Sequence, residues 1–224
     1  ARDPQPARSG TCPLCHCAQD GASHILAGCQ HTDMRSAYIK RHDLAVKLIQ
    51  KGVTKGTLGG CYTIMDAGKE QELPHTVQGK RLPESLRPPH IPEDMWLRMR
   101  PDILLIPGLP SSAPPTDTEN YLIYLVEVGY CSDTNHTVKM QAKHQQHEVL
   151  TQSLRTAGHT VKNLVITLGT TGTMHRDLIA TLRELGVEKN PSDKVMTKLH
   201  KNATHCASNI ITMRRHREWS GNPD

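Results

Sequence analysis

The chain of 224 residues contains no phenylalanine, and its tryptophans and tyrosines together make up only 3% of the sequence. Hydrophobic residues account for 36%, below the roughly 45–50% usual for a soluble domain. These deficits exclude a large apolar core and a rich set of aromatic stacking platforms. No stretch approaches the ~18 uninterrupted apolar residues of a transmembrane helix, so we expect no membrane partner.

The sequence also lacks an initiating methionine and an apolar signal segment at its start, so we expect a piece of a longer protein. It does contain seven cysteines, of which four fall within the first 30 residues. Without a secretory signal, a local metal site is favoured over a disulfide framework. The net charge of +5 and the pI of about 8.8 are compatible with binding to nucleic acid.

The cysteine-rich segment follows the pattern C-x2-C-x8-H-x4-C. Zinc prefers four thiolate and imidazole ligands in a tetrahedron, and four protein ligands make a structural site. Cys17 and His31 are further candidates, so His31 could replace the last cysteine as the fourth ligand. The alternative is a flexible arm with free thiols. The predicted ligands are Cys12, Cys15, His24 and Cys29.

Hydrophobic periodicity predicts an α/β fold in which early strands pair as a meander and later ones are joined through helices. Helices are expected over 32–51, 136–157, 173–185 and 192–215, with a helical turn at 93–98, and strands over 61–65, 102–106, 121–130 and 164–168. In the helix over 136–157, the side chains expected to face inward are Val138, Ala142, Val149 and Leu154.

Two carboxylates lie in otherwise apolar predicted strands. Asp102 opens one strand and Glu127 lies in the middle of the next, where a lone buried charge is costly unless it is paired or binds a cation. If the strands are neighbours, both side chains and the backbone carbonyl of Val128 could hold Mg²⁺ through oxygen. Such an ion activates water for phosphodiester hydrolysis. The alternative is a structural ion pair between Glu127 and a lysine or arginine.

The helix after the second strand carries Lys139 and Lys143, which share one face because they are four residues apart. A nuclease needs a cation near the scissile phosphate to stabilise developing charge or orient water. We therefore assign that role to Lys143, with Lys139 in reserve. A solvated basic face is the alternative.

Together these motifs resemble the C-terminal part of non-LTR retrotransposon polyproteins, in which a CCHC zinc knuckle precedes a restriction-like PD-(D/E)xK endonuclease. The resemblance covers residues 11–175. In chain order its motifs are the knuckle, Arg41-His42-Asp43, Arg100-Pro101-Asp102, Glu127, the lysine helix and the segment 165–172.

The resemblance implies a mixed β-sheet flanked by helices and a Mg²⁺-dependent enzyme that nicks target DNA to prime reverse transcription. It further implies a nuclear location and, through a reverse transcriptase outside this sequence, contact with element RNA. The expected organisation is a disordered lead-in over 1–10, the knuckle over 11–31, the endonuclease domain over 32–217 and a tail over 218–224.

The resemblance also suggests nucleic-acid contacts for Arg41, His42 and Arg100, although Arg41 and His42 could instead complete a helix end. Two positions depart from the family pattern: Gly129 stands where the Glu-x-Lys lysine would be, and Asp43 stands where asparagine is usual. Two other functions compete, a non-cleaving nucleic-acid-binding module and a zinc-stabilised protein-interaction domain. The former would use the C-terminal basic residues Lys194, Lys198, Lys201, Arg214, Arg215 and Arg217.

Overall fold

The computed structural model describes residues 10–220, without the side chains of 217–220. Residues 1–9 of the expected lead-in and 221–224 of the expected tail lie outside this range, as does the side chain of Arg217. The helices are α1 (Thr32–Thr54), α2 (Glu93–Trp96), α3 (His136–Gln146), α4 (Glu148–Thr156), α5 (Leu178–Glu184) and α6 (Lys189–Ser220). The strands are β1 (Cys61–Met65), β2 (Ile103–Pro110), β3 (Leu122–Cys131) and β4 (Thr160–Gly169), and short helical turns are η1 (His24–Gly28), η2 (Glu70–Glu72) and η3 (Glu84–Leu86).

The four strands form one mixed sheet in the order β1-β2-β3-β4. The first three strands are antiparallel, whereas β3 and β4 are parallel and are joined through α3 and α4. This confirms the predicted meander followed by a helical connection. Ile103 pairs with Val126, so Asp102 and Glu127 come next to each other across the β2–β3 pair.

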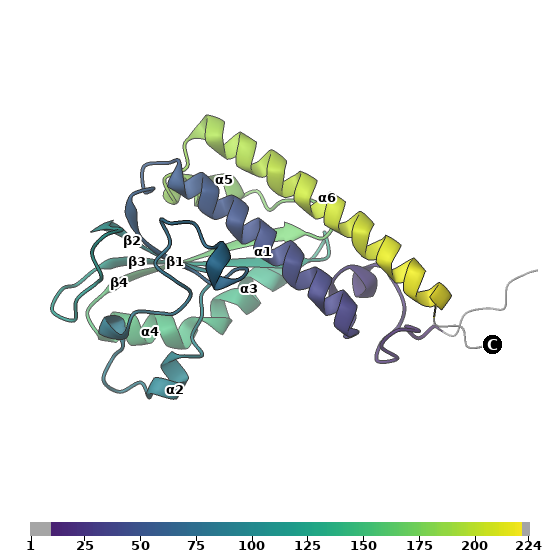
Figure 1. Ribbon diagram of the computed structural model, residues 1–224, viewed down its shortest axis with the longest axis horizontal. Helices are drawn as coiled ribbons and strands as arrows, with labels where there is room; N and C mark the ends of the chain where they lie inside the picture. The colour runs from purple at the N-terminus through teal and green to yellow at the C-terminus, as the bar shows by residue number, and fades with distance from the viewer. Residues whose placement is uncertain (1–9, 221–224) are drawn as a thin grey trace, which may run out of the picture.

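Helices cover both faces of the sheet (Figure 1). Helices α1 and α6 lie side by side on one face, and α3 and α4 lie on the opposite face. Alternate residues of β3 point to the two sides: Val126 and Val128 join the core under α1, α5 and α6, whereas Ile123 and Leu125 join a second core under α4. This alternation follows from the two-residue period of a strand.

The predicted helix over 136–157 is wrong in one respect, because it divides at His147 into α3 and α4. Val138 and Val149 were expected to face inward but are 67% and 51% exposed, and Ala142 is exposed as well. Helix α3 contains no buried residue. It lies over the part of the sheet that carries Glu127 and Thr167, so polar side chains replace the apolar contacts that the helical pattern suggested.

Other boundaries move by a few residues. Strand β4 begins at Thr160, four residues before the expected start, and β2 continues through Pro107 to Pro110. Helix α6 reaches Ser220, within the expected tail. The structure is thus a mixed α/β fold with a four-stranded mixed sheet flanked by helices. Among residues 10–220, no helix combines the length and the apolar character needed to span a bilayer.

Candidate functional site

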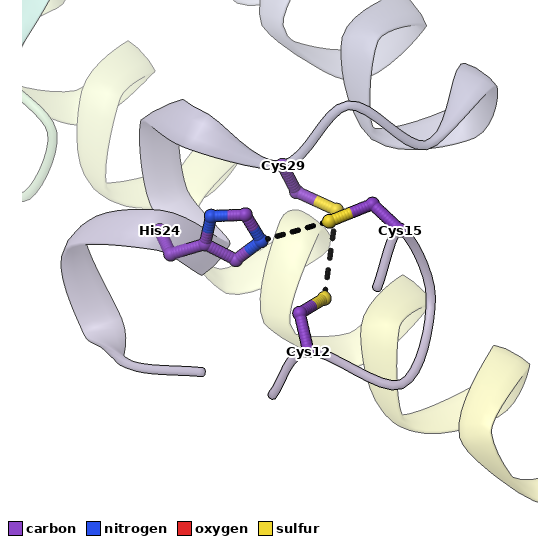
Figure 2. Close-up of side chains that lie close together, drawn as sticks. All are labelled: Cys12, Cys15, His24 and Cys29. Atoms are coloured by element: carbon purple, nitrogen blue, oxygen red, sulfur yellow. Dashed lines mark hydrogen bonds between the residues drawn. The ribbon is translucent and has the colours of Figure 1, made fainter. Parts of the chain in front are cut away.

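Four cysteine and histidine side chains converge near the N-terminus (Figure 2). Their ligand atoms all lie within 4.8 Å of one another. Cys12 Sγ lies 3.9 Å from Cys29 Sγ, and Cys15 Sγ lies 3.3 Å from His24 Nε2. A zinc tetrahedron with Zn–S bonds of ~2.3 Å and Zn–N bonds of ~2.0–2.1 Å has edges of about 3.6–3.8 Å. The group could therefore hold a metal ion such as zinc.

The electrostatics of the thiols also suit a metal. A backbone hydrogen bond at Cys17 lowers the pKa of Cys15 to about 6, so this thiol readily provides a thiolate. Burial raises the pKa of Cys29 to about 11. A divalent cation would supply the positive charge that ionises a buried thiol, because a coordinating thiol is deprotonated.

The fourth member of this group is Cys29 and not His31. The Nδ1 atom of His31 accepts a hydrogen bond from Asp33 N at 3.4 Å and so caps the start of α1. Cys17 is exposed, and its Sγ donates to the carbonyl of Cys15 at 2.8 Å. Both spare residues that the sequence left open therefore have other roles.

We call residues 11–31 the zinc module, because their cysteine and histidine group could hold zinc. Side chains that reach its backbone hold it against α1. The Tyr38 hydroxyl donates to Ile25 O at 2.6 Å, and Arg41 Nη1 donates to Leu26 O at 2.9 Å. The Arg41 guanidinium also lies 4.2 Å from the centre of the Tyr130 ring, within cation–π range. The module is thus anchored to the same helix that supports the sheet.

The structure corrects the expectation for Arg41. This side chain is only 2% exposed and is committed to the zinc module and Tyr130, so its charge is not presented to a nucleic acid. Its place in the middle of α1 also excludes the helix-end alternative. Arg214 is likewise buried, at 3% exposed, and donates to Asp20 Oδ1 at 2.9 Å, so it ties α6 to the zinc module.

The second centre, the carboxylate site, brings together Asp102, Glu127, His42, Lys143 and His147. Asp102 Oδ2 accepts a hydrogen bond from Val128 N at 2.7 Å, and His42 Nε2 lies 3.1 Å from the same oxygen. Burial favours the neutral carboxyl, but the contact with His42 and the charge of Lys143 outweigh it, so the pKa of Asp102 is lowered.

The pKa of the His42 imidazole shifts in the opposite direction. Burial disfavours a charged His42, but the hydrogen bond and charge of Asp102 outweigh burial, and the pKa of His42 is raised. His42 Nδ1 also lies 3.4 Å from Asp43 Oδ1. The other carboxylate oxygen of Asp43 accepts from Gly68 N at 2.8 Å, so the Asp43 that departs from the family pattern fixes the loop after β1.

Glu127 is 1% exposed and is surrounded by donors. Its Oε2 accepts from Lys143 Nζ at 2.9 Å, and its Oε1 accepts from Asp102 N at 3.1 Å. His147 Nε2 lies 2.7 Å from Oε1 without hydrogen-bond geometry. The ion pair considered as an alternative for Glu127 is therefore present, and its partner is Lys143.

Gly129 explains how the lysine helix approaches the strand. A Cβ added there would lie 3.1 Å from Lys139 Cε and 3.5 Å from Lys143 Cε. Glycine thus leaves room for both aliphatic stems to cross β3. In a strand-borne Glu-x-Lys motif the lysine would occupy this position, whereas here the helix delivers Lys143 to Glu127.

Two expected site residues remain: Val128, as a Mg²⁺ ligand through its carbonyl, and Arg100, as a nucleic-acid contact. Val128 contacts Asp102 through its N–H, and its carbonyl has no described contact with a carboxylate. Arg100 is exposed, and its Nε donates to Leu97 O at 3.4 Å. The sequence reasoning missed His147, although the four-residue spacing from Lys139 to Lys143 continues to it and marks the same helical face.

The chain was compared with protein-family models and with curated proteins. No family model matches it, and no curated protein matches it. Within residues 10–220, the zinc group is the one set of three or more cysteine, histidine or acidic residues placed closely enough to hold a metal. The two centres therefore differ: one is a complete four-ligand set, and the other is an acid pair neutralised by bases.

Proposed function

We propose that this chain is a zinc-supported, Mg²⁺-dependent DNA endonuclease of the restriction-like PD-(D/E)xK type. In this proposal it nicks target DNA in the nucleus, and the resulting 3′-hydroxyl primes reverse transcription in non-LTR retrotransposition. The element RNA would be a partner through the associated reverse transcriptase. The sequence motifs that resemble this family support the proposal, together with the carboxylate site.

The observation that carries the proposal is the meeting of two acids and one lysine from separate elements. Asp102 lies directly before β2 and Glu127 lies in the neighbouring strand β3, and Lys143 from the following helix lies 2.9 Å from Glu127 Oε2. Helix α3 buries no residue. Apolar packing therefore does not account for its position against the sheet. A polar layer at such a position is costly to build without a functional use.

The donor chemistry fits Mg²⁺. Asp102 Oδ1 makes no hydrogen bond within the described part of the chain, whereas Oδ2 is held by Val128 and His42. Mg²⁺ prefers carboxylate oxygens and retains several waters, so Asp102 and Glu127 would hold it, with Val128 beside them. When bound, the ion polarises the phosphate and lowers the pKa of a bound water.

The protein's own residues then have distinct tasks. Lys143 places a positive charge beside Glu127, where it can stabilise the charge that develops on a scissile phosphate. Lys139 lies one turn away and serves as its reserve. His42 keeps Asp102 ionised and oriented through the 3.1 Å contact, so it is a positioning residue.

The second candidate is a non-cleaving nucleic-acid-binding module. Its support is that both acids already have cationic or N–H partners within the protein. An acid pair that is neutralised internally can serve as a structural ion-pair network, which also perturbs pKa values. Nucleic acid would then be held by exposed lysines and Arg100.

The decisive experiment measures nicking of supercoiled plasmid in Mg²⁺ by the parent, by Asp102→Asn and by a control, Asp94→Asn. Asp94 is an exposed acid of α2 that pairs with Arg98, which follows the helix. Asp102→Asn should abolish nicking and leave DNA binding in place, whereas Asp94→Asn should nick like the parent. Equal nicking by Asp102→Asn and the parent would place the chemistry elsewhere, and no nicking by a folded, zinc-loaded parent would favour the binding module.

A further inference from the structure

A groove runs between the C-terminal end of α1 and the first turns of α6. Its hollow has a volume of about 180 Å³, and apolar atoms of Leu48 and Val195 contribute to its lining. Gly52 shapes it: a Cβ added there would lie 2.8 Å from Val195 Cγ2, so glycine lets the two helices approach closely. We call this feature the lysine groove, after the four lysines that line it: Lys51, Lys55, Lys194 and Lys198.

The lysine groove carries charge of one sign. All four lysines are exposed, no acidic residue lines the hollow, and none of the four ammonium groups has an ion-pair partner within residues 10–220. Some lysines elsewhere are neutralised by acids: Lys47 pairs with Glu72, and Lys80 pairs with Asp66. A second hollow continues along α6 to Lys201 and includes Asp193.

The spacing of these lysines is unfavourable for an isolated protein. Lys51 and Lys55 are four residues apart, and so are Lys194 and Lys198. Like charges at this spacing repel each other along a helix, and the facing walls of the groove add further repulsion. A bound polyanion removes this cost, because phosphates neutralise the lysines and release their own counterions.

We propose that the lysine groove binds the phosphate backbone of duplex DNA, as a second contact separate from the carboxylate site. Helix α1 joins the two places, since it carries both His42 and Lys51. The two residues are nine positions apart, which is roughly 14 Å along the helix axis at about 1.5 Å per residue and about half a turn around it at ~3.6 residues per turn. They therefore point to different sides of α1, and the groove is a contact of its own. The proposal takes its choice of DNA from the proposed function.

The test measures duplex DNA binding by fluorescence anisotropy over a series of salt concentrations, without Mg²⁺. Lys51→Gln/Lys194→Gln removes one charge from each wall. Since each lost phosphate contact reduces the salt slope by about 1, the double variant should lose about 2 and bind more weakly. The matched control, Lys40→Gln/Lys69→Gln, removes the same charge from exposed positions outside the groove and should leave the slope close to the parent's.

Lys51→Arg/Lys194→Arg keeps the charge and should keep the binding, which guards against loss of fold as the cause. An unchanged slope in the glutamine variant, or an equal loss in the control, overturns the proposal. Stronger, groove-dependent binding of duplex RNA of the same length overturns the choice of DNA. The nicking assay stays independent: lysine-dependent binding without nicking refutes the proposed catalysis alone, and nicking without lysine dependence refutes the groove alone.

Discussion

The zinc module and the carboxylate site share α1 but are built in opposite ways. The four residues that could hold a metal lie close together in sequence, from Cys12 to Cys29, and their thiols and imidazole converge without an intervening counter-charge. The carboxylate site collects residues from α1, from the position before β2, from β3 and from α3 and its end, and each acid already contacts a base. The comparison teaches that a local motif can present a complete set of ligands, whereas a dispersed site depends on the whole fold.

The largest effect is expected from losing a zinc ligand. Cys29→Ser removes one of four ligands from a buried position, and structural zinc binding contributes on the order of 10 kcal/mol in small zinc modules. We expect loss of stoichiometric zinc, measured by mass spectrometry of metals, and unfolding of the zinc module, measured by amide exchange over 11–31. Cys17→Ser, at the exposed spare cysteine, should keep its zinc, and full retention by Cys29→Ser would remove Cys29 from the ligand set.

An intermediate effect is expected from breaking the buried ion pair of the carboxylate site. Lys143→Met leaves Glu127, 1% exposed, without its ammonium partner, and such a change costs about 3 kcal/mol of unfolding free energy. Denaturant unfolding measures it. Lys139→Met keeps the apolar stem over Gly129 and should cost less than about 1 kcal/mol.

The pair can be tested further with Glu127→Gln, which removes the buried charge. In that background Lys143→Met should cost clearly less than it does in the parent, because no unpaired carboxylate remains. Equal costs in both backgrounds would show that the 2.9 Å contact contributes nothing to stability.

The smallest effect concerns pH. The pKa of His42 is raised above 6.5 and that of Asp102 is lowered below 3.8. The stability contributed by His42 is fully present below pH 6.5 and is lost as the pH rises through its raised pKa. The contribution of Asp102 is present above pH 3.8 and is lost as the pH falls through its lowered pKa. The stabilisation by the pair is therefore complete between these limits.

Melting temperatures without Mg²⁺, measured across this range for the parent and for His42→Gln, check the prediction. The difference between the two proteins should be largest between pH 4 and 6.5 and should shrink on either side. A constant difference at all pH values would mean that the contact between His42 and Asp102 is not an ion pair in solution.

Much of the fold could be predicted because its signals are local. The apolar strand around Glu127 and the meander of the first three strands follow from hydrophobic patterning, and the cysteine and histidine group that could hold zinc follows from spacing. The division of the helix at His147 could not be predicted, because the exposed position of Val138 depends on a polar sheet surface below α3, whereas α4 turns Leu150 and not Val149 to the core. Arg41 was misassigned for a similar reason: its partners, Leu26 and Tyr130, are distant in sequence.

The sequence by itself determined the α/β class, the four thiol and imidazole side chains of the zinc group and the two acids at apolar strands, since each of these is a matter of residue type and short spacing. Only the tertiary structure decided which lysine reaches Glu127, that Cys29 and not His31 completes the zinc group, and that Arg41 is an anchor. These outcomes depend on the pairing of β2 with β3 and on how α1 and α3 pack on the sheet, which bring together residues far apart along the chain.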